Sequence, residues 1–177
     1  MRALAPAALC LVLAGCAGGA PEQSDWERAH EAQGWQESRV ALPPYPKKAS
    51  LIQFDVGAGT DFRFLIDAGS LSVGSDGVVR YVLVARSPQG AENVSFEGLR
   101  CRDGEYKIYA TGRSDGTWLE VREPRWRAVE QSAGSWHRTL ASNYFCPAQE
   151  PIRTVAEGVD ALKRGGKSRS GELLRDP

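Results

Sequence analysis

Apolar side chains stand at every second position along much of the segment 50–121, and this period of two constrains the fold more than any other feature of the sequence. The alternation is clear in residues 52–56 and again in residues 62–66. Because successive side chains of a strand point to opposite faces of a sheet, the pattern predicts strands with one buried face. The Gly-containing stretch 57–60 between the two runs predicts a hairpin.

Three Asp-Gly pairs separate the later runs, at residues 76–77, 103–104 and 115–116. Asp-Gly readily adopts the positive φ angles that tight hairpins need. The run 78–85 is apolar at almost every position, which predicts a central strand covered on both faces. Gly98 stands where the alternation changes phase and predicts a β-bulge there. We therefore expect a strongly bent, antiparallel sheet of about five to seven strands.

A helix is predicted at each end of this sheet. Residues 25–33 follow a capping-box serine and precede Gly34, which can end a helix. Apolar residues recur with helical spacing in 152–162, after Pro151 and before Gly165. The predicted fold class is therefore α+β, with a short N-terminal and a longer C-terminal helix.

The start of the chain has the pattern of a lipoprotein signal peptide. Arg2 precedes an apolar run over residues 3–13, and Leu-Ala-Gly stands directly before Cys16. The apolar run is too short for a transmembrane helix, which needs about 20 residues. We expect residues 1–15 to be removed, Cys16 to carry lipid, and residues 16–23 to form a flexible tether.

The residue after the lipidated cysteine bears on localisation. Lipoproteins retained at the inner membrane usually carry Asp there, whereas this chain has Ala17. The expected location is therefore the periplasmic face of the outer membrane, with the protein held by its lipid anchor.

The proline-rich segment 42–46 predicts an extended connector. We expect one domain over residues 24–164 and a disordered tail over residues 165–177.

Removal of the signal peptide and lipidation leave two cysteines available for a disulfide. Cys10 leaves with the signal and Cys16 carries lipid, so Cys101 and Cys146 remain. In an oxidising compartment this pair is expected to form a disulfide, closing a loop of about 45 residues and stabilising the fold by roughly 4 kcal/mol. The alternative is two separate buried thiols.

Composition excludes several classes of partner. Lys and Arg number 22, as do Asp and Glu, so the formal net charge is zero and nucleic acid is not expected as a partner. His30 and His137 lie far apart in the mature chain and lack metal-ligand spacing, so we expect no metal and treat each as a surface or cap residue. No cofactor is expected, and the oligomeric state stays open.

One pattern is typical of a catalytic nucleophile. Residues 112–116 read Gly-Arg-Ser-Asp-Gly, which matches the nucleophile elbow of serine hydrolases, and His137 follows later in the chain. An elbow requires a strand before the serine and a helix after it, whereas residues 117–121 predict a strand. A periplasmic serine hydrolase using Ser114 is therefore an alternative to a non-catalytic role.

Exposed tryptophan and arginine side chains offer a second candidate site. Trp126, Trp136 and Arg138 lie in a polar part of the sequence and are our candidate contact patch for an envelope protein or a glycan. The alternative is that the tryptophans pack around the disulfide, which we expect for Trp118 in any case.

Three segments carry a resemblance to a known family. They are Gly-Ser-Asp-Gly-Val-Val-Arg-Tyr at 74–81, Gly-Ala-Glu-Asn-Val-Ser-Phe-Glu-Gly-Leu-Arg-Cys at 90–101 and Asp-Gly-Thr-Trp at 115–118. The chain resembles the CNP1-like family, small envelope proteins of Gram-negative bacteria, from about Trp26 to Leu162. The resemblance implies one domain and supplies no ligand or catalytic residue.

The expected function is therefore non-catalytic: a lipoprotein that binds or scaffolds an envelope partner. Besides the hydrolase, a further alternative is a small ligand bound in the concavity of the sheet. A lined cavity would favour the ligand.

Overall fold

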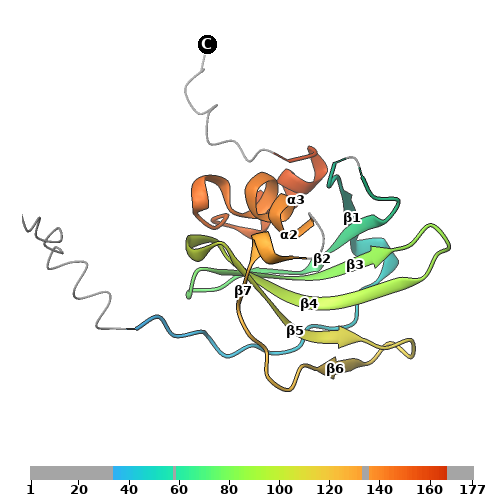
Figure 1. Ribbon diagram of the computed structural model, residues 1–177, viewed down its shortest axis with the longest axis horizontal. Coiled ribbons are helices and arrows are strands. Elements are labelled where there is room, and N and C mark those ends of the chain that lie inside the picture. Colours follow the sequence, from blue (N-terminus) through green and yellow to red (C-terminus); the bar gives the residue numbers. More distant parts are fainter. Residues whose placement is uncertain (1–33, 58, 133–135, 167–177) are drawn as a thin grey trace, which may run out of the picture. The chain divides into compact units, whose positions relative to one another are not determined.

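The computed structural model describes residues 34–57, 59–132 and 136–166. Its centre is a seven-stranded sheet in the order β1-β2-β3-β4-β5-β6, with β7 pairing with β5 (Figure 1). The strand pairs of this sheet are antiparallel, which confirms that part of the prediction. The strands are β1 (Leu51–Phe54), β2 (Arg63–Val73), β3 (Val78–Arg86), β4 (Glu92–Arg100), β5 (Glu105–Gly112), β6 (Trp118–Glu120) and β7 (Arg127–Ala128).

The helices gather on one face of this sheet (Figure 1). A short helix, α2 (Trp136–Thr139), continues into a π-helical turn, Leu140–Phe145, and α3 (Val155–Lys163) follows. The helix predicted for residues 152–162 starts later than expected, because the side chain of Thr154 caps it by accepting a hydrogen bond from the backbone N–H of Glu157 at 3.1 Å. The predicted helix 25–33 lies outside the described residues.

The predicted central strand is confirmed, since β3 lies between β2 and β4 and is buried along most of its length. The Asp-Gly pairs also lie in links between consecutive strands, and their glycines Gly77, Gly104 and Gly116 have φ angles of 75°, 62° and 81°. These angles are unfavourable for residues with a Cβ atom, which explains the glycines.

The bulge predicted at Gly98 is wrong. The β4–β5 register shifts between Phe96 and Glu97, which pair with Ala110 and Ile108, so the extra residue is Tyr109 in β5. The change of apolar phase in β4 arises because both faces of this strand are buried. A Cβ atom at Gly98 would lie 2.7 Å from the hydroxyl of Tyr109, so the glycine makes room for that ring.

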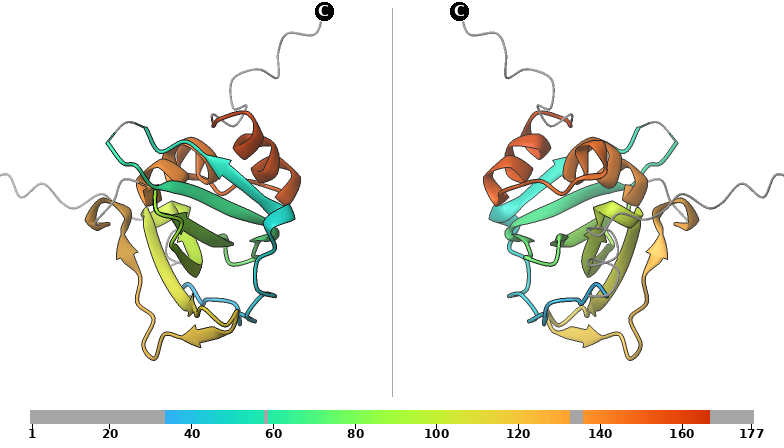
Figure 2. Two further views of the ribbon diagram at one scale, coloured as in Figure 1. Left: turned by 90° about the vertical axis from the view of Figure 1, so that its right-hand side faces the viewer. Right: turned by 90° about the vertical axis from the view of Figure 1, so that its left-hand side faces the viewer.

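Apolar side chains pack on both faces of the sheet. The helix-side core joins strand residues to the helical segments, with Ile66, Tyr81, Leu99, Leu140, Phe145, Ile152 and Leu162 among its members. The second core consists of Leu65, Val82, Val84, Val94, Phe96, Tyr109 and Ala110. Residues 37–47, which we call the strap, lie on this second face, opposite the helices (Figure 2).

The strap has an extended course, as predicted for residues 42–46, and side chains of the sheet hold it in place. The indole N–H of Trp118 donates to the backbone carbonyl of Pro43 at 2.9 Å. The hydroxyl of Tyr45 donates to the carbonyl of Arg113 at 3.1 Å, and its ring packs on Trp118 with centroids 5.1 Å apart. The strap therefore covers apolar surface of the sheet that would otherwise face water.

The structure forms the expected disulfide between Cys101 and Cys146, which are 45 residues apart in sequence. This bond ties the end of β4 to the segment that follows the π-helical turn, so it joins the sheet to the helical layer. Within the described residues, no helix combines the length and apolarity needed to span a membrane.

Candidate functional site: a cavity beside a buried glutamate and histidine

A cavity of 370 Å³, large enough for a small organic ligand, opens between the helical layer and the sheet. Its walls are mainly apolar. The apolar lining consists of Phe62, Phe64, Leu83, Ala85, Ile108 and Trp136. Its polar lining consists of Thr60, Asn93, Ser95, Glu97 and His137.

Strand alternation places these groups together. Leu83 on β3 pairs with Ser95 on β4, and Ala85 pairs with Asn93, so all four side chains point to the helix-side face. Trp136, the first residue of α2, closes the cavity by stacking on Phe64, with ring centroids 5.1 Å apart and planes 22° apart.

Glu97 lies at the polar end of the cavity and is 2% exposed. The hydroxyl of Ser95 donates to its Oε1 at 2.5 Å, and the hydroxyl of Tyr81 donates to its Oε2 at 3.1 Å. A buried carboxylate needs such partners, because leaving it unpaired would cost several kcal/mol. Burial and the neighbouring charge of Glu97 in turn raise the pKa of Tyr81 well above its ordinary value.

His137 completes this cluster from α2. Its Nε2 lies 2.9 Å from Oε2 of Glu97, and its Nδ1 lies 2.7 Å from Oγ of Ser132. The ring of Tyr106 stacks on the imidazole, with centroids 3.8 Å apart. The expectation that His137 is a surface or cap residue is therefore wrong: it is 3% exposed, because a carboxylate and an aromatic ring both enclose it.

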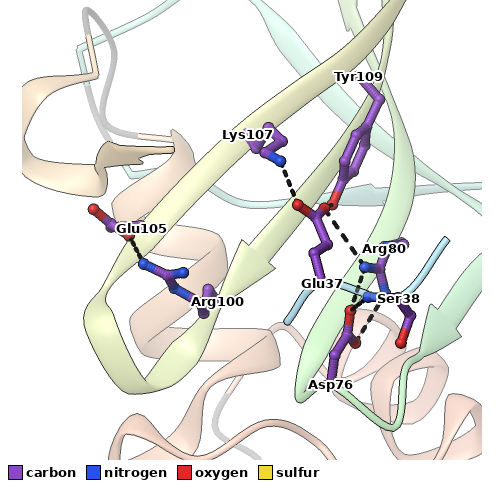
Figure 3. Close-up of polar contacts among 8 residues, drawn as sticks. All are labelled: Glu37, Ser38, Asp76, Arg80, Arg100, Glu105, Lys107 and Tyr109. Carbon is purple, nitrogen blue, oxygen red and sulfur yellow. Dashed lines mark hydrogen bonds and ion pairs between the residues drawn. The ribbon is translucent and has the colours of Figure 1, made fainter. Parts of the chain in front are cut away.

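A second polar cluster lies on the strap side of the sheet (Figure 3). The carboxylate of Glu37, at the start of the strap, pairs with Lys107 and accepts a hydrogen bond from the hydroxyl of Tyr109 at 2.6 Å. Burial opposes ionisation of Glu37, but these hydrogen bonds outweigh it and lower its pKa. Burial, and then the hydrogen bond to Glu37, raise the pKa of Tyr109. This cluster anchors the strap to the sheet.

Asp76 belongs to this second cluster as well. It accepts hydrogen bonds from the guanidinium of Arg80, at 3.1 and 2.6 Å, and from the backbone N–H of Ser38 at 2.9 Å. Burial alone would raise the pKa of Asp76. The hydrogen bonds from Arg80 and from the backbone N–H groups of Ser38 and Val78 outweigh this effect and lower the pKa to about 2. Ser38 and Arg80 are thereby held on one carboxylate.

The structure does not bring Trp126, Trp136 and Arg138 together as one patch. Trp136 lies on the helix side, whereas the ring of Trp126 lies 4.8 Å from Nζ of Lys107 and so on the strap side. Arg138 is exposed, but both tryptophans are partly buried. Strand alternation explains the separation, because Lys107 and its neighbour Tyr106 point to opposite faces of β5.

Ser114 lies at the turn between β5 and β6, where the backbone N–H of Gly116 donates to the carbonyl of Arg113. The sequence pattern around Ser114 therefore spans a strand–turn–strand hairpin, not a strand-to-helix elbow, and the serine is exposed. Cys16, His30 and residues 167–177 of the expected tail lie outside the described residues.

Sequence reasoning missed Glu97, Ser132 and the role of His137. Glu97 and His137 are 40 residues apart in sequence, so no local spacing of residues indicates that their side chains are in contact. A glutamate inside a strand otherwise rich in buried positions was the available signal. Among the described residues, no group of three His, Cys, Asp or Glu side chains converges on a metal-binding position.

The sheet and the helical layer define an α+β domain with a cavity of 370 Å³ beside a buried polar cluster. The chain belongs to the CNP1-like family, whose model matches residues 30–163. It is 26% identical over 153 residues to Cryptic neisserial protein 1 of Neisseria gonorrhoeae (strain ATCC 700825 / FA 1090), covering 77% of this chain and 75% of that protein. No solved structure matches the chain.

Proposed function

We propose that this protein is a lipid-anchored binding protein of the bacterial envelope, and that its cavity takes a small, largely apolar ligand. The observation that carries the proposal is the 370 Å³ cavity, whose aromatic and aliphatic walls end at a buried carboxylate and imidazole. Binding sites for small molecules typically combine apolar walls with a few fixed polar groups in this way.

The two kinds of lining have different roles. Phe62, which is 42% exposed, and Trp136 offer apolar surface at the edge of the cavity, so a ligand covering them gains hydrophobic stabilisation. Glu97 and His137 are held by partners on several sides and do not have to rearrange when a ligand arrives. A ligand is therefore bound mainly by its apolar part and oriented at its polar end.

The lipid anchor is supported by the sequence around Cys16, where a cationic start, an apolar run and Leu-Ala-Gly precede the cysteine. Ala17 after it favours the periplasmic face of the outer membrane. On this proposal the domain collects its ligand in the periplasm, beside the membrane that anchors it.

A matched pair of variants tests the cavity, with the fluorescent dye N-phenyl-1-naphthylamine as the probe. Ala85→Phe places a benzyl group in the cavity, whereas Ala91→Phe adds the same group at an exposed position in the β3–β4 turn. We expect the wild-type protein and Ala91→Phe to bind the dye equally, and Ala85→Phe to bind it at least about tenfold more weakly. Equal binding by a folded Ala85→Phe variant would overturn the proposal.

A further inference from the structure

A serine, a histidine and a glutamate from three separate parts of the chain form a continuous hydrogen-bonded row. Ser132 follows a 3-10 turn, Val129–Gln131, His137 lies in α2, and Glu97 lies in β4. Oγ of Ser132 is 2.7 Å from Nδ1 of His137, and Nε2 of His137 is 2.9 Å from Glu97. A hydroxyl on a base that a third group orients is the usual arrangement of an activated nucleophile.

The direction of the hydrogen bonds in this row follows from the donors available. A carboxylate oxygen accepts hydrogen bonds, so Glu97 accepts from the hydroxyls of Tyr81 and Ser95 and from Nε2 of His137. A neutral imidazole with its proton on Nε2 has a free lone pair on Nδ1. The hydroxyl of Ser132 must then donate to Nδ1, which is the direction a general base requires.

The surroundings keep the base fixed and the serine reachable. His137 is 3% exposed and stacks on Tyr106, so its ring cannot turn freely. Ser132 is only partly buried, and His137 itself lines the cavity. The two imidazole nitrogens have exchanged the places they hold in the serine proteases, but either can accept the proton.

We propose that Ser132 is a catalytic nucleophile, with His137 as its general base and Glu97 as the group that orients the base. The substrate class is an ester of an apolar carboxylic acid. This inference departs from the non-catalytic role expected from the sequence. Its choice of acyl group rests on the proposed function, because His137, the base for Ser132, lines the apolar cavity.

The reaction balances without a further reagent. Oγ of Ser132 bonds to the carbonyl carbon while its proton moves to Nδ1 of His137; the alcohol then leaves with that proton, and the acyl group stays on Ser132. Water next attacks the acyl carbon and gives a proton to Nδ1, which returns it to Ser132 as the carboxylic acid departs. The net reaction converts ester and water into acid and alcohol.

A serine-reactive alkyl fluorophosphonate tests this on the full chain, with peptide mapping of the labelled site. Ser114 is an internal control, because it is exposed and lies in a serine-hydrolase sequence pattern but has no imidazole beside it among the described residues. We expect Ser132 to be labelled at least about 100-fold faster than Ser114. Ser132→Ala should abolish the label, and Ser114→Ala should leave it unchanged.

Two further variants test whether His137 and Glu97 activate Ser132 or only stabilise the fold. His137→Gln and Glu97→Gln should each slow labelling of Ser132 at least about 100-fold at temperatures where circular dichroism shows the variant folded. Labelling at Ser132 that is no faster than at Ser114, or unchanged in a folded His137→Gln variant, would overturn the inference. If the fluorophosphonate fails to label Ser132 in wild-type protein that still binds the dye, the inference is overturned and the proposed function stands.

Discussion

The carboxylate of Asp76 holds Arg80 and the strap at once, because it accepts from the guanidinium at 2.6 Å and from the backbone N–H of Ser38 at 2.9 Å. The Asp76 side chain is only 1% exposed, so water cannot easily replace either partner. The charge of this buried carboxylate therefore contributes to the attachment of the strap, beside the contacts of Glu37, Pro43 and Tyr45.

This dependence predicts how stability varies with pH. The pKa of Asp76 is about 2 in the folded protein, below its ordinary value of 3.8. A lowered folded-state pKa contributes stability that is present above the unfolded pKa and is lost as the pH falls through the folded one. We expect Asp76→Asn to lower the free energy of unfolding by about 2 kcal/mol at pH 7, with the difference from wild type shrinking towards pH 2.

Denaturant unfolding at pH 7 and at pH 2.5 measures this effect. Asp61→Asn is the control, because Asp61 is exposed and removal of its charge should change stability little at either pH. A difference between wild type and Asp76→Asn that stays constant over this pH range would contradict the prediction.

The disulfide predicts a large effect of reduction. Opening the bond between Cys101 and Cys146 releases a loop of 45 residues, and we expect the melting temperature to fall by about 10 °C. Scanning calorimetry with and without reductant measures this shift. A double Cys101→Ser, Cys146→Ser variant should melt like the reduced protein and should not respond to reductant. Two reactive thiols in unfolded, unreduced wild-type protein would show that the bond is absent.

Gly98 is expected to resist substitution. Its missing side chain leaves space for the Tyr109 hydroxyl, which would lie 2.7 Å from a new Cβ atom, and for Val78 at 3.0 Å. We expect Gly98→Ala to lower the free energy of unfolding by about 1–3 kcal/mol, as measured by urea denaturation. Gly69→Ala is matched to it, since its new Cβ atom would meet only atoms 3.5 Å away or more. Equal losses in the two variants would refute the steric explanation.

Trp136 and Arg138 are two residues apart but should behave differently. Trp136 stacks on Phe64 and packs against the helix-side core, so Trp136→Ala should lower the free energy of unfolding by about 2–4 kcal/mol. Arg138 is exposed, so Arg138→Ala should change it by less than about 0.5 kcal/mol. Thermal unfolding of both variants decides this, and similar melting temperatures would show that Trp136 is not a core residue.

The proposed lipid anchor predicts a change in the mass and location of the protein. Protein made in a Gram-negative host should carry acyl groups at Cys16 and should sediment with outer membranes after fractionation. Cys16→Ser should remain unlipidated and should no longer sediment with them. Intact-mass spectrometry of the two forms is the measurement, and a wild-type protein without acyl groups would remove the basis for the anchor.

Strands and turns were predictable because their signals are local. The alternation in residues 52–56 and 62–66 gave the β1–β2 hairpin, and each Asp-Gly pair marks a turn that requires a positive φ angle. The bulge was misplaced because alternation along β4 alone cannot show which partner strand holds the extra residue. That depends on β5, where Tyr109 has no partner residue in the register with β4.

The candidate site was much less predictable. The contact between Glu97 and His137 depends on how α2 packs on the sheet, and α2 has only four residues, too few for a helical period to be visible in the sequence. The separation of Trp126 from Trp136 likewise depends on which face of β5 each approaches. Both are consequences of tertiary packing, which single-sequence patterns do not encode.

The position of the strap also sets where the chain can be shortened. Glu37 attaches the start of the strap to the sheet through Lys107, and Tyr45 packs on Trp118 beside the second core. A fragment that begins at residue 37 keeps that apolar face covered. One that begins at residue 48 would expose a strip of valine and phenylalanine side chains to water, and such surfaces promote self-association. Residues 37–47 thus belong to the minimal folding unit even though they contain no helix or strand.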